Sequence, residues 1–367
     1  MKPIYKIIGV LLIIVLVGLG IYLGWRKIIA PGPEEPAGNE PARGNITETK
    51  TENGLHLKKL SDNPVFGHWI YGGEIYYLDL DGKVFVAKDG ADTEISKETF
   101  SALNNIEQSS GGSRILTSFG DPTNPSWGIF DSRDKAWRPL DSNILNAAWG
   151  GDDETLFVVV RNGSSLNLSE IDTQKNSSPK ILIRDFRFKD IDILWKTPQT
   201  LLFLERPSAH YPGRLWQLDL KTLALNLLVA PLGGLIVQPS DDENIFFEFF
   251  SASREILILD SSFKPIVSEA SFVTLPSKCA FFASTTYCFE PQEIPTNVTL
   301  PDDYLNKSFF SVDNLFTLNL ETGELKRILT SGEGGLPAID AKNPKVAGNS
   351  LFFINRYDDS LYELRFK

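Results

Sequence analysis

Three arginines occupy the same position in three copies of a recurring sequence phrase. Arg161, Arg206 and Arg356 each follow the first apolar residue of a predicted strand by five residues. Guanidinium groups bind carboxylates and sulfates through two parallel hydrogen bonds, so a partial ring of arginines would suit an anionic ligand such as an acidic sugar. The alternative, which the acidic composition favours, is that each arginine pairs with a carboxylate of its own or a neighbouring repeat.

Other candidate ligand-binding residues are expected on the same face as these arginines. His210 and Tyr211 lie in the long loop 206–213, and about 22 extra residues, Pro291 to Asp313, interrupt the sixth repeat. The insertion carries Asp302, Asp303 and Tyr304, and it is too apolar for a solvated linker. We expect it to fold over the face, either as a functional lid or partner contact or as a structural flap over a central channel.

Two cysteines indicate the compartment. Cys279 and Cys288 flank a predicted hairpin turn centred between Ala283 and Ser284, which places them directly opposite each other at a non-hydrogen-bonded pair. The Cα atoms of such a pair lie about 4.5 Å apart, which suits a disulfide, and a disulfide would favour the exterior of the cell. The alternative is a pair of small buried thiols in a reducing compartment.

Residue patterns for catalysis or metal binding are weak. The acidic runs Asp152-Asp-Glu, Asp241-Asp-Glu and Asp358-Asp resemble catalytic pairs, but each lies at a predicted turn, where aspartate stabilises the backbone. Three histidines lie far apart in the sequence, so we predict no metal site and no cofactor. We find no nucleophile elbow, phosphate loop or dinucleotide fingerprint.

The elements that would position these residues come from a repeat. A turn followed by an apolar strand recurs seven times, at steps of 40, 41, 45, 44, 42 and 64 residues. A period in the low forties, built from short strands, predicts an all-β, seven-bladed β-propeller. Only residues 96–105 could form a short helix after position 60. The seven first anchors are Ile75, Ile115, Leu156, Leu201, Ile245, Tyr287 and Leu351.

A second series of anchors predicts the third strand of each repeat, and the chain ends predict how the ring closes. The segment 55–60 resembles the fourth-strand segment 325–329, so we assign it to the seventh blade, where it would cover an open edge. The second anchors are Val84, Trp127, Leu166, Leu215, Ile256, Leu315 and Leu361.

The N-terminal part of the chain has a different composition. Ile7 to Trp25 is an uncharged run of 19 residues, about 28 Å long as a helix, which predicts a membrane anchor within residues 1–30 that binds the lipid bilayer. A cleaved signal peptide is the alternative. Residues 31–53 are rich in proline and acidic side chains and predict a disordered linker, followed by the propeller at 54–367.

Charge narrows the choice of partner. The net charge is −11, and the first thirty residues contribute four positive charges and no acid, which leaves −15 for the rest. A domain this acidic disfavours nucleic acid as a partner. Charges around the predicted span are nearly balanced, so the extracytoplasmic placement of the propeller depends on the predicted disulfide.

Residues Ala148-Trp149-Gly-Gly-Asp-Asp-Glu-Thr-Leu-Phe157 resemble the TolB-type, WD40-like propeller repeat, in which a Trp-Ser-Pro-Asp-Gly turn precedes an apolar strand. The sixth repeat, from Lys278 to Asp313-Asn-Leu-Phe, resembles a segment of uncharacterised bacterial single-span, membrane-anchored propeller proteins. The turn Gly150-Gly-Asp-Asp departs from the TolB pattern, and no Trp-Asp dipeptide ends a blade. The resemblance implies an exported binding domain and transfers no catalytic residue.

The sequence therefore predicts a membrane-anchored extracytoplasmic scaffold that binds a protein or a glycan on the face carrying residues 291–313. The alternative is a propeller enzyme acting on cell-envelope or exogenous glycans. A deep pocket with two carboxylates on the loop-rich face would favour the enzyme. Fold alone does not decide between them.

Overall fold

The computed structural model describes residues 48–50, 55–88, 91–175, 178–188, 190–240, 244–266 and 272–366. The predicted membrane span, Ile7 to Trp25, and most of the predicted linker lie outside these residues. Within the described ranges, none of the helices has the length and apolar character needed to cross a membrane.

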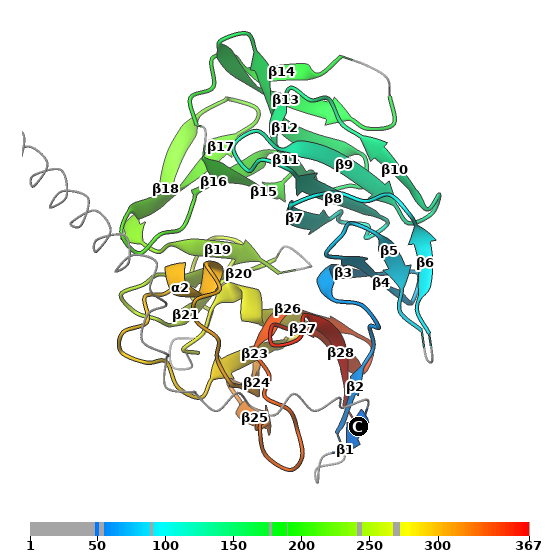
Figure 1. The fold of residues 1–367 in the computed structure, drawn as a ribbon. Coiled ribbons are helices and arrows are strands. Elements are labelled where there is room, and N and C mark those ends of the chain that lie inside the picture. Colours follow the sequence, from blue (N-terminus) through cyan, green and yellow to red (C-terminus); the bar gives the residue numbers. More distant parts are fainter. Residues whose placement is uncertain are drawn as a thin grey trace, which may run out of the picture. The chain divides into compact units, whose positions relative to one another are not determined.

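The described residues form seven antiparallel sheets that follow one another around a ring in chain order, which confirms the predicted β-propeller (Figure 1). Every first anchor lies in the second strand of its sheet, and every second anchor lies in the third strand. Blade one consists of β3 (Val65–Tyr71), β4 (Glu74–Asp79), β5 (Val84–Val86) and β6 (Thr93–Ser96). Blade two consists of β7 (Leu103–Gln108), β8 (Arg114–Phe119), β9 (Ser126–Asp131) and β10 (Ala136–Pro139). Blade three consists of β11 (Ile144–Trp149), β12 (Thr155–Asn162), β13 (Ser165–Asp172) and β14 (Lys180–Ile183).

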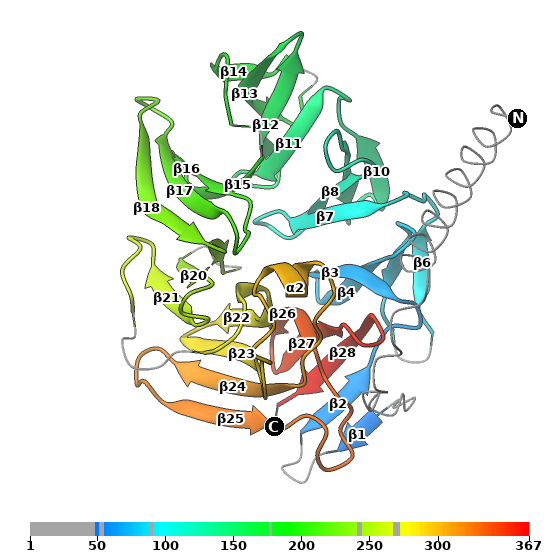
Figure 2. The ribbon, with the colours of Figure 1, turned by 60° about the vertical axis from the view of Figure 1, so that its left-hand side comes forward.

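Blades four to six continue the same order from the inner to the outer strand, and blade five is three-stranded in its described part (Figure 2). Blade four consists of β15 (Ile191–Thr197), β16 (Thr200–Glu205), β17 (Pro212–Asp219) and β18 (Leu225–Gly233). Blade five consists of β19 (Ile236–Pro239), β20 (Ile245–Phe249) and β21 (Ile256–Asp260). Blade six consists of β22 (Cys279–Phe282), β23 (Thr285–Pro291), β24 (Asp313–Asn319) and β25 (Leu325–Leu329).

Blade seven joins the two ends of the propeller, as the sequence predicted. Its inner strands are β26 (Ala341–Ala347), β27 (Ser350–Asn355) and β28 (Ser360–Arg365), and β2 (His56–Lys59) pairs with β28 as the fourth strand. Three residues predicted to be linker instead form β1 (Glu48–Lys50), which pairs with β2. A short strand at a sheet edge is held by backbone hydrogen bonds, so it does not need the aliphatic side chains that this segment lacks.

The prediction of a short helix over 96–105 was wrong. Strand β6 ends at Ser96, β7 begins at Leu103, and Ala102 between them has a φ of 53°, which a helix does not allow. The described α-helix, α2 (Asp302–Leu305), is a single turn inside the insertion, and a 3₁₀ turn covers Pro276–Lys278. One turn is too short to show a helical hydrophobic period in the sequence.

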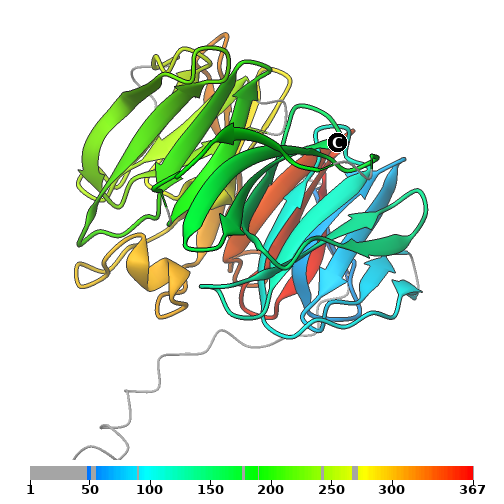
Figure 3. The same ribbon diagram turned by 90° about the horizontal axis from the view of Figure 1, so that it is seen from above.

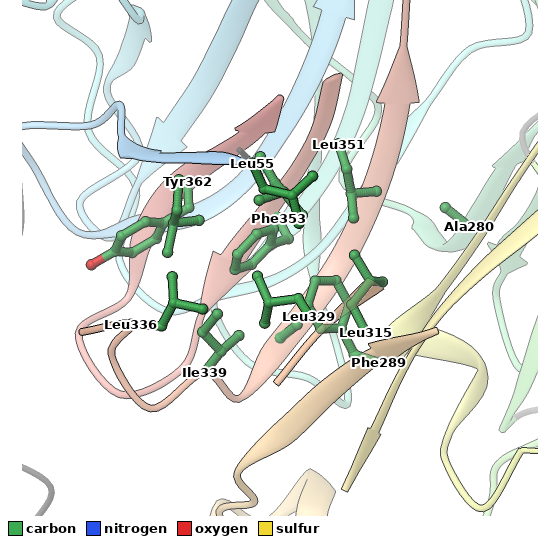
Figure 4. Packing of buried hydrophobic residues seen from close by; sticks show 13 residues of the cluster. Leu55, Ala280, Phe289, Leu315, Leu329, Leu336, Ile339, Leu351, Phe353 and Tyr362 are labelled. Atoms are coloured by element: carbon green, nitrogen blue, oxygen red, sulfur yellow. The ribbon is translucent and has the colours of Figure 1, made fainter. Parts of the chain in front are cut away.

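The core lies between neighbouring blades, because each sheet is covered on both faces (Figure 3). Between blades six and seven, for example, Phe289 and Leu315 belong to one cluster with Phe353 and Leu351 (Figure 4). All six residues of β27 are buried. Burial on both faces explains why the second strands read as continuous apolar runs, and hence why they served as anchors.

The predicted disulfide is confirmed. Cys279 and Cys288 are directly paired in the hairpin of β22 and β23, and they are bonded with their Cα atoms 4.2 Å apart. Ala283 in the turn has a φ of 57°. The bond ties the innermost strand of blade six to the next strand.

Candidate ligand-binding face

Topology gathers the predicted site residues on one face. Strands alternate in direction, so the loops between second and third strands leave every sheet at the same end as the connections between blades. Residues 206–211, the insertion 291–313 and Arg356 all belong to such loops. We call this surface, formed by the loops between second and third strands, the insertion face.

A channel of about 1500 Å³ runs along the ring axis. The inner strands of all seven blades line it, and Tyr304, Leu305 and Lys307 of the insertion contribute to its wall. Arg161, Arg206 and Arg356 line it as well, which brings four of the predicted site residues to one cavity. Their role in binding remains a prediction.

The insertion is fixed to blades four and five by hydrogen bonds. The carboxylate of Asp302 accepts from Ser208 Oγ at 3.0 Å and from the backbone N–H of Ala209 at 2.6 Å. Ser251 Oγ donates to the carbonyl of Leu300 at 2.6 Å. Asp302 is therefore part of the attachment of the loop, and it does not line the channel.

Apolar side chains of the insertion extend the core. Leu300, Tyr304 and Phe309 are buried against Phe249 and Leu275 of blade five and the segment after it. Asp303 accepts from the backbone N–H of Thr299 at 2.7 Å and stabilises the loop internally. The insertion is thus an ordered element, in agreement with the expectation that it folds over the face.

Arg356 does not point a free guanidinium at a ligand. Its Nη1 donates to Asp340 Oδ2 at 2.8 Å, its Nη2 donates to the carbonyl of Tyr304 at 3.0 Å, and its guanidinium carbon lies 3.9 Å from the centre of the Tyr304 ring. For this arginine, the alternative of an ion pair with a neighbouring acid is the one that the structure shows.

Beneath the insertion lies a buried ionic cluster that the sequence analysis missed. Lys278 Nζ donates to Asp313 Oδ2 and to Asp340 Oδ1, each at 2.5 Å, and to Ser311 Oγ at 3.0 Å. Burial acts to lower the pKa of Lys278, but the carboxylates of Asp313 and Asp340 outweigh it and raise that pKa. The two cations and two carboxylates of this cluster, with Arg356 included, satisfy one another. We therefore assign it a structural role.

Arg161 and Arg206 remain exposed at the channel mouth. Asp192 of β15 is exposed to the channel. Desolvation by the surrounding channel wall raises its pKa, and the positive charge of Arg206 opposes this rise. Arg161 makes no ion pair with any residue that the structure describes. Of the three predicted arginines, Arg161 is the one best placed to meet a ligand.

Two lysines at the same mouth were not predicted. Lys342 of β26 and Lys307 of the insertion both line the channel. Burial lowers the pKa of Lys342 to about 8, the positive charges of Lys307 and Arg356 add to this, and Asp359 opposes it. Lys342 lies at a register shift of β26 and Lys307 lies in the insertion, so strand alternation in the sequence indicates neither of them.

His210 and Tyr211 lie on the rim and do not line the channel. Tyr211 is 76% exposed, and it is joined on this face by Leu305 at 52% and Phe310 at 41%. The contacts of Asp302 with Ser208 and Ala209 bring the loop of Tyr211 next to the insertion. Exposed aromatic and aliphatic residues thus surround a cationic opening.

The acidic runs have local structural roles where the structure describes them. Asp152 Oδ1 accepts from the backbone N–H of Glu154 at 2.9 Å, and Asp358 Oδ1 accepts from that of Ser360 at 3.1 Å, as expected for turns. Asp153 also links blades two and three, because it accepts from the backbone N–H of Gly111 at 2.8 Å. The run 241–243 lies outside the described residues. Within those residues, no group of His, Cys, Asp and Glu side chains could hold a metal ion.

Comparisons with known proteins support the fold and do not identify the protein. No protein-family model matches the chain, and no curated protein matches it. Among solved structures, oligogalacturonate lyase from Vibrio parahaemolyticus is 9% identical with a TM-score of 0.57, covering 87% of this chain and 96% of its own. A chain of the Mitotic Checkpoint Complex is 11% identical with a TM-score of 0.52, covering 88% and 98%. An uncharacterized protein from Listeria monocytogenes EGD-e is 13% identical with a TM-score of 0.50, covering 85% and 92%. At these identities the likeness shows a shared propeller fold alone.

Proposed function

We propose that the protein is a membrane-anchored scaffold whose propeller lies on the extracytoplasmic side and binds a protein or glycan ligand on the insertion face. The observation that carries this proposal is the ordered insertion, whose exposed Leu305 and Phe310 lie with Tyr211 of the adjoining loop at a cationic channel mouth. Aromatic side chains and arginine are the residue types enriched in binding interfaces.

Two features support the membrane and the compartment. The uncharged run from Ile7 to Trp25 is long enough to span a bilayer, and the described disulfide favours an oxidising environment. The proline-rich segment that follows the run would hold the propeller away from the bilayer.

The face is best tested with surface substitutions and not with a deletion. Deleting residues 292–312 would destabilise the propeller, because it would uncover Phe249 and Leu275 and remove Ser311 from Lys278. Substitution of exposed residues avoids this effect.

We expect the pair Tyr211→Ser and Leu305→Ser to reduce capture of the envelope ligand by at least about tenfold, since each removes an exposed anchor. The matched control is Leu227→Ser, which removes a leucine that is 47% exposed on the outer strand β18. Capture is measured by pull-down from solubilised envelopes with the full-length chain, and thermal unfolding checks the fold. Full capture by the folded double variant would refute this binding face.

The runner-up function, a glycan-processing enzyme, is favoured by one observation. Asp190 and Asp192 both line the channel, and desolvation by the channel wall raises the pKa of Asp192, which is the direction that a general acid requires. If this reading is right, Asp192→Asn will abolish the release of reducing ends from envelope glycans while leaving their binding unchanged. If wild-type protein releases none, the enzyme reading fails.

A further inference from the structure

The positive charges at the channel mouth stand out because most buried cations of this acidic domain are satisfied. Lys278 and Arg356 are paired beneath the insertion, and Arg114 pairs with Asp131 at 2.9 Å. Lys342, which is half-buried, and Lys307, which is exposed, make no ion pair or side-chain hydrogen bond with any residue that the structure describes. Their mutual repulsion favours a bound anion.

A local irregularity in β26 places Lys342 at the mouth. The pairing of β26 with β27 shifts register between Lys342 and Lys345, and Asn343 within the shift has a φ of 51°. Such a bulge re-aims the side chains of an inner strand. Here Lys342 and Asn343 both line the channel, and the Lys342 ammonium lies 5.6 Å from the centre of the Phe66 ring.

Lys307 approaches the same place from the insertion. It directly follows the α2 turn with a φ of 59°, a conformation that glycine or asparagine adopts at lower cost than lysine. Its backbone N–H donates to the carbonyl of Tyr304 at 3.1 Å, which anchors the residue at the channel wall. The backbone conformation of this turn does not favour a lysine at position 307, whereas a site that binds an anion does.

The other polar residues that line the channel indicate which class of molecule bears the anionic group. Asn105, Gln238 and Asn343 line the channel, and their amide groups make no side-chain hydrogen bond with the described residues. An amide both donates and accepts, so it suits hydroxyl groups. Charged donors for carboxylates and free amides for hydroxyls together match a sugar acid better than a peptide, whose recognition depends mainly on backbone pairing and side-chain pockets.

We propose that the ligand of the insertion face is an acidic oligosaccharide, whose carboxylates bind Lys307 and Lys342 while its hydroxyl groups meet the amides of the channel. Arg161 lines the same mouth and is available for a further carboxylate. Asp190 and Asp192, on the blade-four side, would repel an anion, which favours Lys307 and Lys342, on the side of blades six and seven, as the main carboxylate site. This inference rests on the proposed function and narrows its ligand.

The test is calorimetric titration of the full-length chain in detergent with three probes. The probes are a hexasaccharide of uronic acids, the same hexasaccharide with its carboxyls as methyl esters, and hexaglutamate. We expect the acidic hexasaccharide to bind at least about tenfold more tightly than either other probe. Lys342→Met keeps the apolar stem over Phe66, and Lys307→Asn suits the left-handed backbone, so both variants should fold.

Each lysine substitution should weaken the acidic hexasaccharide by about tenfold, the size expected for one charge-assisted hydrogen bond. Lys326→Gln, which removes an equal charge from the exposed outer strand β25, should change affinity less than about twofold. Equal binding of the ester, or full affinity in the Lys307→Asn, Lys342→Met double variant, would overturn the anion site. Tighter binding of hexaglutamate would overturn the sugar assignment, and absence of binding by all three probes would overturn the inference as a whole. The capture experiment with the Tyr211 and Leu305 variants tests the insertion face separately. A failure of this inference can therefore be distinguished from a failure of the proposed function.

Discussion

Replacing Lys278 with methionine should destabilise the propeller strongly. The variant leaves Asp340 paired with Arg356 at 2.8 Å, but Asp313 keeps only neutral donors, Ser311 Oγ at 2.7 Å and the backbone N–H of Ala341 at 2.9 Å. Both carboxylates are fully buried. Removing one partner of a buried ion pair costs roughly 3–5 kcal/mol, which for a domain of this size lowers Tm by roughly 5–8 °C.

The effect should also depend on pH in a defined direction. Without Lys278, burial raises the pKa of Asp313 further, so the folded variant binds a proton that the unfolded chain releases. The free energy of unfolding of the variant should therefore fall as pH rises above about 4, the pKa of an unperturbed aspartate. At low pH the deficit relative to wild type should be smaller.

Urea unfolding at several pH values, with limited proteolysis of the insertion, measures both effects. Adding Asp313→Asn to Lys278→Met removes the stranded charge and should recover more than half of the lost free energy. Lys326→Met, on an exposed strand, serves as the matched control and should cost less than about 0.5 kcal/mol. A cost for Lys278→Met below about 1 kcal/mol, or no recovery in the double variant, would refute the structural role of this cluster.

Further predictions concern the disulfide and the channel. Replacing Cys279 and Cys288 together with alanine should lower the free energy of unfolding by about 2.7 kcal/mol, the loop-entropy estimate for about ten residues, as measured by urea unfolding. In protein denatured directly from cells, a thiol reagent should label these buried cysteines only after reduction. Labelling of denatured, unreduced protein would contradict an extracytoplasmic propeller. Affinity for the uronic-acid probe should fall as pH rises through about 8, because an anion binds the protonated form of Lys342, and this dependence should be absent from Lys342→Met.

The architecture could be predicted because the second strands are buried on both faces. Leu156, Leu201 and Leu351 are each fully buried, so their neighbours form apolar runs that a repeat search detects. The pairing of the N-terminal strand with β28 followed from its likeness to a fourth strand. The disulfide followed from hairpin register alone, since residues facing each other across a short turn have a constant number sum.

The ionic cluster could not be predicted, because its members come from separate parts of the chain. Lys278 lies 35 residues from Asp313 and 62 from Asp340, and no local pattern links them. Arg356 was placed on the right face, but its partners depend on how the insertion folds, which a segment without a period does not reveal. Lys342 reaches the channel through a bulge, a feature that strand alternation does not show.

The most direct test of a ligand-binding insertion face is site-specific photo-crosslinking in intact cells. A photoreactive amino acid is placed at Tyr211 on the rim and, in a second strain, at Leu225 on the outer strand β18, which is 39% exposed. We predict a discrete adduct from position 211 and none from position 225. Equal adducts from both positions, or adducts from position 225 alone, would contradict the account.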